Sequence, residues 1–350
     1  MTKASDKLAA VVTLADFEPL ARAAMEPPAF DYVAGGSWDE LTLADNEVAW
    51  RRRRFRPRVL IDVSTVDPST TMLGRPVALP VAIAPMAVHG LAHPDGEIPT
   101  ARAAAAAGIP FTLSTTSSRS IEEVAVGAPG GTRWFQLYPQ SDPAVSRALV
   151  ERAEAAEYNA IMLTVDMAVL GYRERDRRSG FLLPPLGNFP GGTQVRLQDH
   201  LHHVVTWADL STIQGWSSLP LILKGIMTAE DARLAVEHGV EAIVVSNHGA
   251  RQLDRVSAGV DVLEEVVAAV NGHLEVWVDG GVRRGLDIAI ALAMGAQGVL
   301  IGRPVFWALA AGGAAGVERA IAILRDEFEL SLALLGVRTP ADIRPEHLVR

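Results

Sequence analysis

Eight short runs rich in apolar and β-branched residues recur along the chain and constrain its fold more than any other feature. They lie at residues 77–84, 109–114, 133–138, 160–166, 221–224, 242–247, 275–279 and 298–303. Stretches with helical spacing separate them, most clearly at 100–107, 144–156, 229–238, 260–270 and 286–294. Strands that alternate with helices imply parallel βαβ units. Eight such units predict an α/β fold of the closed (β/α)8 TIM-barrel type.

Two segments flank the predicted barrel, which we expect to occupy residues 77–311 of a single domain spanning 1–350. Residues 1–76 are predicted to form a helical N-terminal arm. Residues 312–350 are predicted to form a C-terminal helical tail, with its clearest helix at 317–335. The connection after the fourth strand, residues 167–220, is the longest. Because so long a loop in a compact domain is usually functional or mobile, we expect it to form a lid.

The bulk composition excludes several classes of function. A net charge of -9 argues against a nucleic-acid partner, which would require many Lys and Arg contacts to phosphate. The only basic run, residues 51–54, is expected to be solvated or paired within the chain. The absence of cysteine excludes disulfides, thiolate nucleophiles and zinc–thiolate sites. No run of about 18 uncharged apolar residues predicts a membrane span, and we expect a cytoplasmic protein.

Residues 246–254, which read SNHGARQLD, place a base and a fixed cation together just after the sixth strand. His248 is able to take a proton near neutral pH, and Arg251 is able to hold a carboxylate in a bidentate geometry. That pairing suits chemistry on a small anionic acid. A polar barrel loop without function is the alternative interpretation of this segment alone.

Polar side chains follow nearly every predicted strand, and in these barrels the active site lies at the C-terminal ends of the strands. Burying such charges costs several kcal/mol each unless they are paired or serve a ligand, so they predict a ligand site. The first strand ends in the apolar Met86 and Ala87. The later strands are followed in order by Ser114, Gln136 and Tyr138, Thr164 with Asp166 and Arg173, Lys224, Ser246 and His248, Asp279, and Arg303 after Gly302.

The ends of strands seven and eight indicate a phosphate site. Gly280 and Gly281 precede Arg283, and Gly302 precedes Arg303. Backbone N–H groups in Gly-rich turns and guanidinium groups bind phosphate at this corner of many barrels. A phosphate held here would leave the centre of the mouth open, which predicts a phosphorylated cofactor. The neighbouring Arg284 is expected to point away, into a salt bridge.

The motifs at residues 30–32, 55–60, 136–138, 163–166, 224–225, 246–254, 279–285 and 301–304 together resemble the FMN-dependent 2-hydroxy-acid oxidase and dehydrogenase family, which includes glycolate and lactate oxidases. The resemblance extends from near residue 30 to past residue 330. It implies FMN as cofactor and oxidation of an (S)-2-hydroxy acid, such as lactate, glycolate, mandelate or a longer acid, to the 2-oxo acid. It further implies reduction of O2 to H2O2 and a homotetramer.

The resemblance also implies roles for individual residues. His248 would be the base, with Asp166 stabilising its protonated form. Arg173 and Arg251 would clamp the substrate carboxylate, while Tyr32 and Tyr138 would bond its carboxylate or hydroxyl. Lys224 would stabilise negative charge on the flavin. The remaining cofactor contacts would come from Met86, Ala87, Ser114, Gln136, Thr164, Ser246, Asp279, Gly280, Gly281, Arg283, Gly302 and Arg303.

Several alternatives stay open at this point. A soluble FMN-dependent dehydrogenase would pass electrons to a quinone or protein instead of O2. His248 could remove the α-proton, or the hydroxyl proton together with hydride transfer. Barrel isomerases and IMP-dehydrogenase-like enzymes form a second class, although the latter need a catalytic Cys that this chain lacks. A non-enzymatic flavin-binding protein would not need the base and the arginine clamp.

Two further features have separate interpretations. Thr116 occupies a position where related enzymes often carry a bulky aromatic residue, which implies room for a substrate larger than glycolate unless lid residues such as Phe181 refill the space. His200, His202 and His203 lie close together in the long loop without matched carboxylates, so we expect a solvated loop and no metal.

Overall fold

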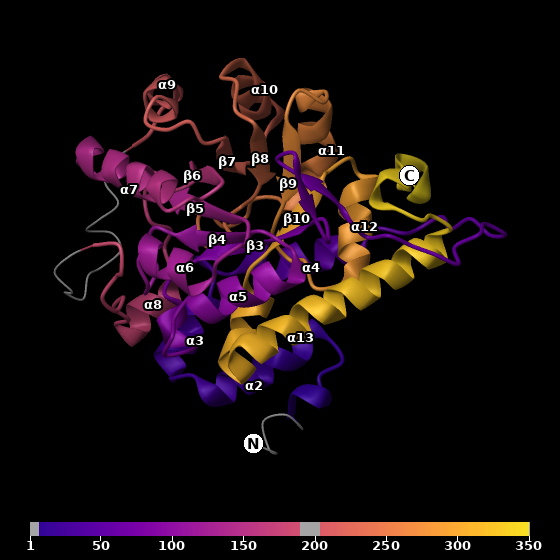
Figure 1. Cartoon of the computed structure of the whole chain (residues 1–350), viewed down its shortest axis with the longest axis horizontal. Coiled ribbons are helices and arrows are strands. Elements are labelled where there is room, and N and C mark those ends of the chain that lie inside the picture. Colours follow the sequence, from indigo (N-terminus) through magenta and orange to yellow (C-terminus); the bar gives the residue numbers. More distant parts are fainter. Residues whose placement is uncertain (1–6, 190–203, 350) are drawn as a thin grey trace.

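In the computed structural model, which describes residues 7–189 and 204–349, eight parallel strands close into a barrel (Figure 1). Around the barrel each strand pairs with its neighbour in the chain, and β10 closes the ring by pairing with β3. The predicted (β/α)8 fold is confirmed. The strands are β3 (Val81–Met86), β4 (Phe111–Ser114), β5 (Arg133–Leu137), β6 (Ala160–Thr164), β7 (Leu221–Ile226), β8 (Ala242–Val245), β9 (Glu275–Val278) and β10 (Gly298–Ile301).

Helices surround the strands and cover the outer face of the barrel. Those that follow barrel strands are α5 (Ile98–Ala107), α6 (Ile121–Gly127), α7 (Pro143–Ala155), α10 (Ala229–Glu237), α11 (Gly259–Val270), α12 (Gly285–Ala293) and α13 (Arg303–Leu335). The N-terminal arm holds α2 (Phe17–Ala24), α3 (Pro27–Ala34) and α4 (Leu41–Arg51). The described parts of the long connection after β6 hold α8 (Glu174–Ser179) and α9 (Leu210–Gln214).

The first barrel strand differs from the predicted range 77–84. Val77 ends a separate strand, β2 (Arg75–Val77), which pairs antiparallel with β1 (Thr70–Met72). Met72 and Val77 are buried among the inward-facing residues of the barrel, so this hairpin closes the N-terminal end of the barrel. The apolar pattern continues without a break from the hairpin through Pro80 into β3. For that reason periodicity alone could not separate the two strands.

Two tryptophans fill the inside of the barrel below the site. Trp134 on β5 and Trp277 on β9 stack with ring centroids 4.9 Å apart and planes 2° from parallel. Both are fully buried, and small residues such as Ala160 and Ala242 on neighbouring strands, and Ala82 on β3, leave room for the rings. Large and small side chains thus interdigitate as a packed barrel interior requires. The barrel interior is filled at this level, which leaves the C-terminal ends of the strands for a ligand.

Helix α13 joins the last barrel helix to the predicted C-terminal tail. Its backbone is non-helical at Gly312 and Gly313, where it kinks, and the φ of +59° at Gly313 is one that glycine adopts at little cost. Within the described residues, α13 is the one helix long and apolar enough to cross a membrane by length and composition. Half of its apolar window is buried, and the helix packs along α2 and α5 (Figure 1). A core helix of a globular protein has the same properties.

The N-terminal arm folds over the mouth of the barrel. The Ser37 N–H donates to the carbonyl of Ala250 and the Trp38 N–H to the carbonyl of Tyr172, both at 2.9 Å. Further along the arm, the indole N–H of Trp50 donates to the carbonyl of Gly280 at 2.8 Å. These contacts connect the arm to the loops after β6, β8 and β9. The arm therefore contributes directly to the wall of the site.

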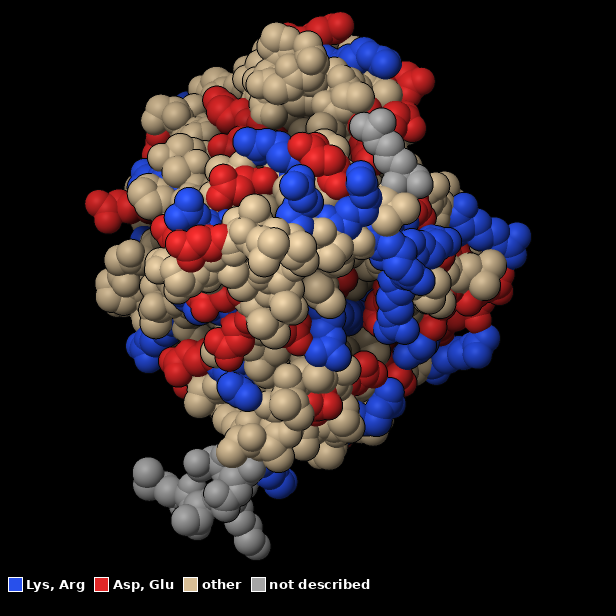
Figure 2. Space-filling view, turned by 90° about the vertical axis from the view of Figure 1, so that its right-hand side faces the viewer, with Lys and Arg blue, Asp and Glu red and all other residues tan. Residues whose placement is uncertain are grey.

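Basic and acidic side chains lie interspersed on the surface shown in Figure 2, with basic side chains gathered in a band across that face. In the basic run at 51–54, Arg52 and Arg53 both pair with Asp261, at 2.9 and 2.6 Å. Arg284 pairs with Glu327 at 2.6 Å, as predicted. Basic residues that the sequence places close together are thus largely neutralised by acidic residues of the same chain.

Candidate active site

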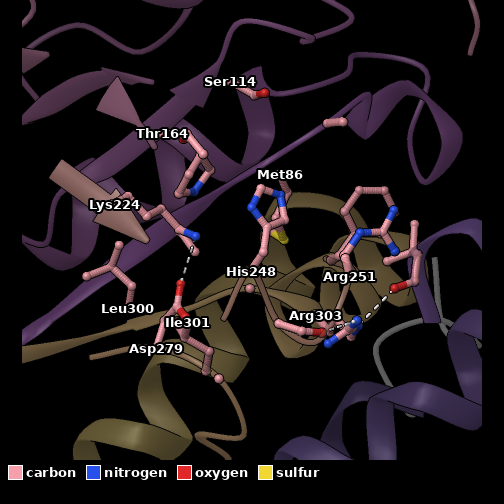
Figure 3. A pocket seen from close by; sticks show the side chains of 18 of the residues that line it. Met86, Ser114, Thr164, Lys224, His248, Arg251, Asp279, Leu300, Ile301 and Arg303 are labelled. Carbon is pink, nitrogen blue, oxygen red and sulfur yellow. Dashed lines mark hydrogen bonds and ion pairs between the residues drawn. The ribbon is translucent and has the colours of Figure 1, made fainter. Parts of the chain in front are cut away.

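A cavity of about 1030 Å³, including space open to solvent, lies at the C-terminal ends of the barrel strands (Figure 3). Most predicted site residues line it: Tyr32, Met86, Ala87, Ser114, Tyr138, Thr164, Arg173, Lys224, His248, Arg251, Asp279, Gly280, Gly281, Arg283, Gly302 and Arg303. The other three, Gln136, Asp166 and Ser246, lie behind this lining and bond to residues that form it.

The loop after β8 directs His248 into the cavity. His248, Gly249 and Ala250 have φ values of +58°, +61° and +64°, which are left-handed conformations. Non-glycine residues adopt them at a cost, and such strain is concentrated at functional sites. The hydroxyl of Ser246 accepts the N–H of His248 at 3.1 Å and fixes the turn. The side chain projects toward the same space as Arg251 (Figure 3).

His248 lies between an acid and a phenol. Its Nδ1 is 2.9 Å from Oδ1 of Asp166, and its Nε2 is 3.3 Å from the hydroxyl of Tyr138. Burial lowers the pKa of His248, and the Asp166 carboxylate opposes that effect only in part, so the imidazole is neutral at neutral pH. Burial acts to raise the pKa of Asp166, but His248 and Lys224 outweigh it and the carboxyl stays ionised. Burial raises the pKa of Tyr138, which keeps its proton.

Three guanidinium groups line the cavity without an acidic partner. Among the described residues, none of Arg173, Arg251 and Arg303 forms an ion pair with an Asp or Glu. Each donates instead to backbone carbonyls: Arg173 to Arg251 at 3.2 Å, and both Arg251 and Arg303 to Gly35 at 3.0 Å. Burial lowers the pKa of Arg173 to about 10 and that of Arg303 to about 9, and both remain charged at neutral pH. Uncompensated buried cations favour an anionic ligand.

Helix α3 brings Tyr32 to the cavity beside Arg251. The Arg251 guanidinium lies 4.8 Å from the centroid of the Tyr32 ring and donates to the Tyr32 carbonyl at 2.6 Å. On the connection after β6, Phe181 stacks on Tyr32 at 4.5 Å. Part of the predicted lid therefore lies against the arm. Phe181 does not itself line the cavity, whereas Thr116 does, with its hydroxyl 3.0 Å from that of Ser114.

Lys224 is held at the opposite side of the cavity by Ser246 and Asp279. Its ammonium donates to the Ser246 hydroxyl at 2.8 Å and pairs with Oδ2 of Asp279 at 3.2 Å (Figure 3). The side chains of Lys224 and Asp279 are only 6% and 9% exposed. The other Asp279 oxygen, Oδ1, is buried and has no hydrogen-bond partner among the described residues. Since buried acceptors are normally satisfied, this oxygen is available to a ligand hydroxyl.

The turn after β9 contains two consecutive glycines in left-handed conformations. Gly280 and Gly281 have φ values of +87° and +79°, and a Cβ on Gly281 would lie 1.9 Å from the carbonyl oxygen of Asn46. Only glycine fits at position 281, because α4 packs directly against this turn, and both glycines line the cavity. Arg283 follows and pairs with Glu47 at 2.6 Å, so its charge is shared with the arm. With Arg303 close by, this corner has the features expected of a phosphate site.

A hydrogen-bonded row connects the ends of β4, β5 and β6. Gln136 accepts from the Ser114 hydroxyl at 3.1 Å and donates to the Thr164 hydroxyl at 3.0 Å. Its side chain is fully buried, so Gln136 orients the two hydroxyl residues that line the cavity.

Several lining residues carry no chemical signal in the sequence. Val33, Pro85, Leu300, Ile301 and Phe306 contribute apolar surface. Their only sequence signal is that they lie next to predicted site residues. The histidines at 200, 202 and 203 lie outside the described residues, and within the described part no group of three or more acidic or His residues is arranged to hold a metal.

Comparison with known proteins finds one matching family and several similar oxidases. The family described as FMN-dependent dehydrogenase matches residues 21–350. The chain is 50% identical to the L-lactate oxidase of Nostoc sp. strain PCC 7120, covering 95% of this chain and 96% of that protein. It is 47% identical to glycolate oxidase 1 of Zea mays, covering 97% and 96%. The crystal structure of a mandelate oxidase superposes with a TM-score of 0.91 at 43% identity, covering 97% and 98%.

The site fits FMN by its own chemistry. Gly280, Gly281 and Arg303 line the cavity together and provide for a phosphate. The unpartnered oxygen of Asp279 matches a ribityl hydroxyl, and Lys224 places a cation against the central cavity. The chain belongs to the FMN-dependent dehydrogenase family, and its cofactor is FMN.

Proposed function

We propose that the protein oxidises an (S)-2-hydroxy acid to the corresponding 2-oxo acid and reduces O2 to H2O2. The observation that carries this proposal is the convergence in one cavity of a neutral base, His248 on Asp166, with the guanidiniums of Arg173 and Arg251, which have no acidic partner among the described residues. A 2-hydroxy acid presents a carboxylate for the cations and a proton for the base. The named relatives, oxidases of lactate, glycolate and mandelate, support the same reaction.

We propose that two arginines bind the substrate, one in the loop after β6 and one in the loop after β8. Arg173 and Arg251 would hold the carboxylate, since planar guanidiniums bind it with fixed geometry. The hydroxyl of Tyr32 would add a hydrogen bond, because Arg251 lies against its ring. This arrangement would orient the α-carbon toward His248 and exclude water from it.

His248 would then take a proton from the bound acid, which its lowered pKa leaves it ready to accept. The Asp166 carboxylate would stabilise the resulting imidazolium through Nδ1. Tyr138, which keeps its proton, would donate to the substrate oxygen. When bound, FMN would supply the acceptor for the electron pair that leaves the substrate and the route by which that pair reaches O2.

For the cofactor we propose three groups of contacts. Lys224, oriented by Ser246, would stabilise negative charge on the flavin ring. The ring would be bordered by Met86, Ala87, Ser114 and Thr164, with Gln136 orienting the two hydroxyls. The ribityl chain and phosphate would be bound by Asp279, Gly280, Gly281, Arg283, Gly302 and Arg303.

The test is anaerobic mixing of the purified protein with glycolate, lactate and mandelate, followed by admission of air. We expect one of these acids to bleach the yellow flavin band and air to restore it rapidly with formation of H2O2. If the flavin colour returned only slowly in air, the result would indicate that a quinone or a protein, and not O2, is the electron acceptor. Absence of bleaching by any 2-hydroxy acid would refute the proposed reaction.

We also propose that the protein assembles as a homotetramer. The loop after α4 supports this, because Val59 and Leu60 are 78% and 101% exposed, which is unusual for apolar neighbours in a soluble protein. Sedimentation of the wild type and of a Leu60→Glu variant would test it, and a monomeric wild type would refute it. The expected cytoplasmic location stays a prediction that cell fractionation can test.

A further inference from the structure

Gln252 lies where two loops of the site meet, and it makes no contact with the cavity. Its side chain is almost fully buried, at 9% exposure for the residue. The amide nitrogen donates to the carbonyls of Asp166 at 2.9 Å and Val169 at 2.8 Å, and the amide oxygen accepts the N–H of Gly171 at 3.1 Å. Both amide hydrogens and the oxygen are therefore used, and all three partners are backbone groups of the segment after β6.

The two segments, residues 166–173 and 248–252, pack against each other with no space between them. A Cβ on Gly171 would lie 2.4 Å from the carbonyl oxygen of Arg251 and 2.8 Å from the Cα of Gln252. Two residues further on, Arg173 donates to the Arg251 carbonyl at 3.2 Å. Backbone meets backbone here, and the side chain of Gln252 supplies three hydrogen bonds across the contact.

Each segment carries half of the proposed machinery. The segment after β6 begins with Asp166 and ends with Arg173, while the segment after β8 carries His248 and Arg251. The pairing of Asp166 with His248 and the pairing of the two guanidiniums both depend on the alignment of the segments. Gln252 bonds to the first segment at Asp166 and at Gly171, close to both of its functional ends.

We propose that Gln252 is a positioning residue that sets the alignment of the acid–base pair and of the arginine pair at the same time. This inference rests on the proposed function, because it assigns Gln252 to the residues of that reaction. Displacing a reacting group by about 1 Å costs up to roughly 100-fold in rate. Misalignment of residues 166–173 against 248–252 therefore lowers turnover and substrate binding together.

The test is Gln252→Met in the FMN-loaded enzyme. The methionine keeps the length of the side chain and removes all three hydrogen bonds. We expect kcat/KM to fall by roughly 10- to 100-fold, with kcat lower and KM for the acid higher. FMN content and the flavin spectrum stay unchanged. The acidic limb of the kcat/KM profile moves to lower pH, because His248 loses part of the Asp166 interaction that raises its pKa.

Gln297→Met is the matched control. Gln297 accepts from the Val276 N–H at 2.7 Å and donates to the Gly295 carbonyl at 3.0 Å, at the opposite end of the barrel. The Gln297→Met variant loses side-chain-to-backbone hydrogen bonds of the same kind. Its kinetics and pH profile should match those of the wild type. Gln252→Asn retains the amide on a shorter side chain and should show an intermediate loss, which keeps the test available if Gln252→Met does not fold.

Hydrogen exchange separates this inference from the proposed reaction. The amides of residues 167–173 should exchange roughly 3- to 10-fold faster in Gln252→Met than in wild type, and not in the control. If the wild type oxidises a 2-hydroxy acid and Gln252→Met keeps its kcat, KM and pH limb, the inference is overturned. It is also overturned if the control shows equal losses. If no acid reduces the wild type, the proposed function fails, while faster exchange would still locate the effect of Gln252 at this contact.

Discussion

The Asp166→Asn variant tests the proposed chemistry most directly. Asparagine keeps an oxygen that is able to accept the His248 Nδ1–H, so the hydrogen bond is retained and the negative charge is lost. With 2.9 Å between the two atoms and an effective dielectric constant of about 20, the attraction between carboxylate and imidazolium is about 6 kcal/mol. Since each 1.36 kcal/mol is a factor of ten, the expected loss in the rate of substrate oxidation reaches about 10⁴-fold.

The measurement is the rate of flavin bleaching after anaerobic mixing with a saturating acid, because it reports substrate oxidation without the reaction with O2. The pH profile supplies a second readout. Asp166 raises the pKa of His248 against the effect of burial, so its neutralisation lowers that pKa further. The base must be unprotonated, and activity disappears as pH falls through its pKa. The acidic limb of kcat/KM should therefore move to lower pH in the variant.

Asp254→Asn is the control for this experiment. Asp254 is also buried, and it accepts the N–H groups of Thr42 at 2.8 Å and Leu41 at 3.3 Å, without touching His248. We expect it to lower the free energy of unfolding by about 1–3 kcal/mol and to leave the bleaching rate close to wild type. An Asp166→Asn variant that binds FMN and bleaches within tenfold of the wild-type rate would refute the role assigned to this carboxylate.

Three further variants test the base, the clamp and the barrel. His248→Ala should bind FMN and lose at least about 10²- to 10⁴-fold in rate, measured by the same bleaching assay; unchanged turnover would remove it as the base. Arg251→Met should mainly raise KM for the acid and weaken binding of non-reacting carboxylates in spectral titrations, whereas an unaltered KM would count against the clamp. Trp277→Ala should lower the free energy of unfolding by about 3–5 kcal/mol, because it leaves a cavity beside Trp134, and denaturant titration would show whether it does.

The sequence predicted the barrel and the mouth of the site for a topological reason. Parallel strands of a closed barrel all end on one side, so residues that follow separate strands, such as Lys224 and His248, must converge even when they are far apart in the chain. The spacing of the strand runs is therefore enough to predict which polar residues share a cavity. The spacing does not define which of these residues touch. The family resemblance implied the contact between Asp166 and His248, and the structure shows it.

Features that depend on backbone geometry were not predictable in the same way. Val77, which ends the β1–β2 hairpin, continues directly into the apolar run of β3, and only the antiparallel pairing of the hairpin places Met72 under the barrel. Gln252 bonds to three backbone groups, and any sequence offers those groups at every position. The predicted boundary between barrel and tail, at residue 312, coincides with the kink at Gly312 and Gly313, but the sequence did not predict that α13 continues on both sides of it.

The charge of the site also differs from the charge of the chain, and this difference explains how an acidic protein binds anions. The chain has a net charge of -9, and basic and acidic side chains are interspersed on the face shown in Figure 2. In the cavity, Arg173, Arg251 and Arg303 lie together without carboxylate partners among the described residues, and burial lowers the pKa of two of them. The guanidiniums of Arg173 and Arg303 are strongly desolvated, so their interaction with a carboxylate or phosphate is much less screened than it would be at the surface. Anion recognition here depends on where the fold leaves cations unpaired, and the strand ends, the arm and the Gly-rich turns together determine that place.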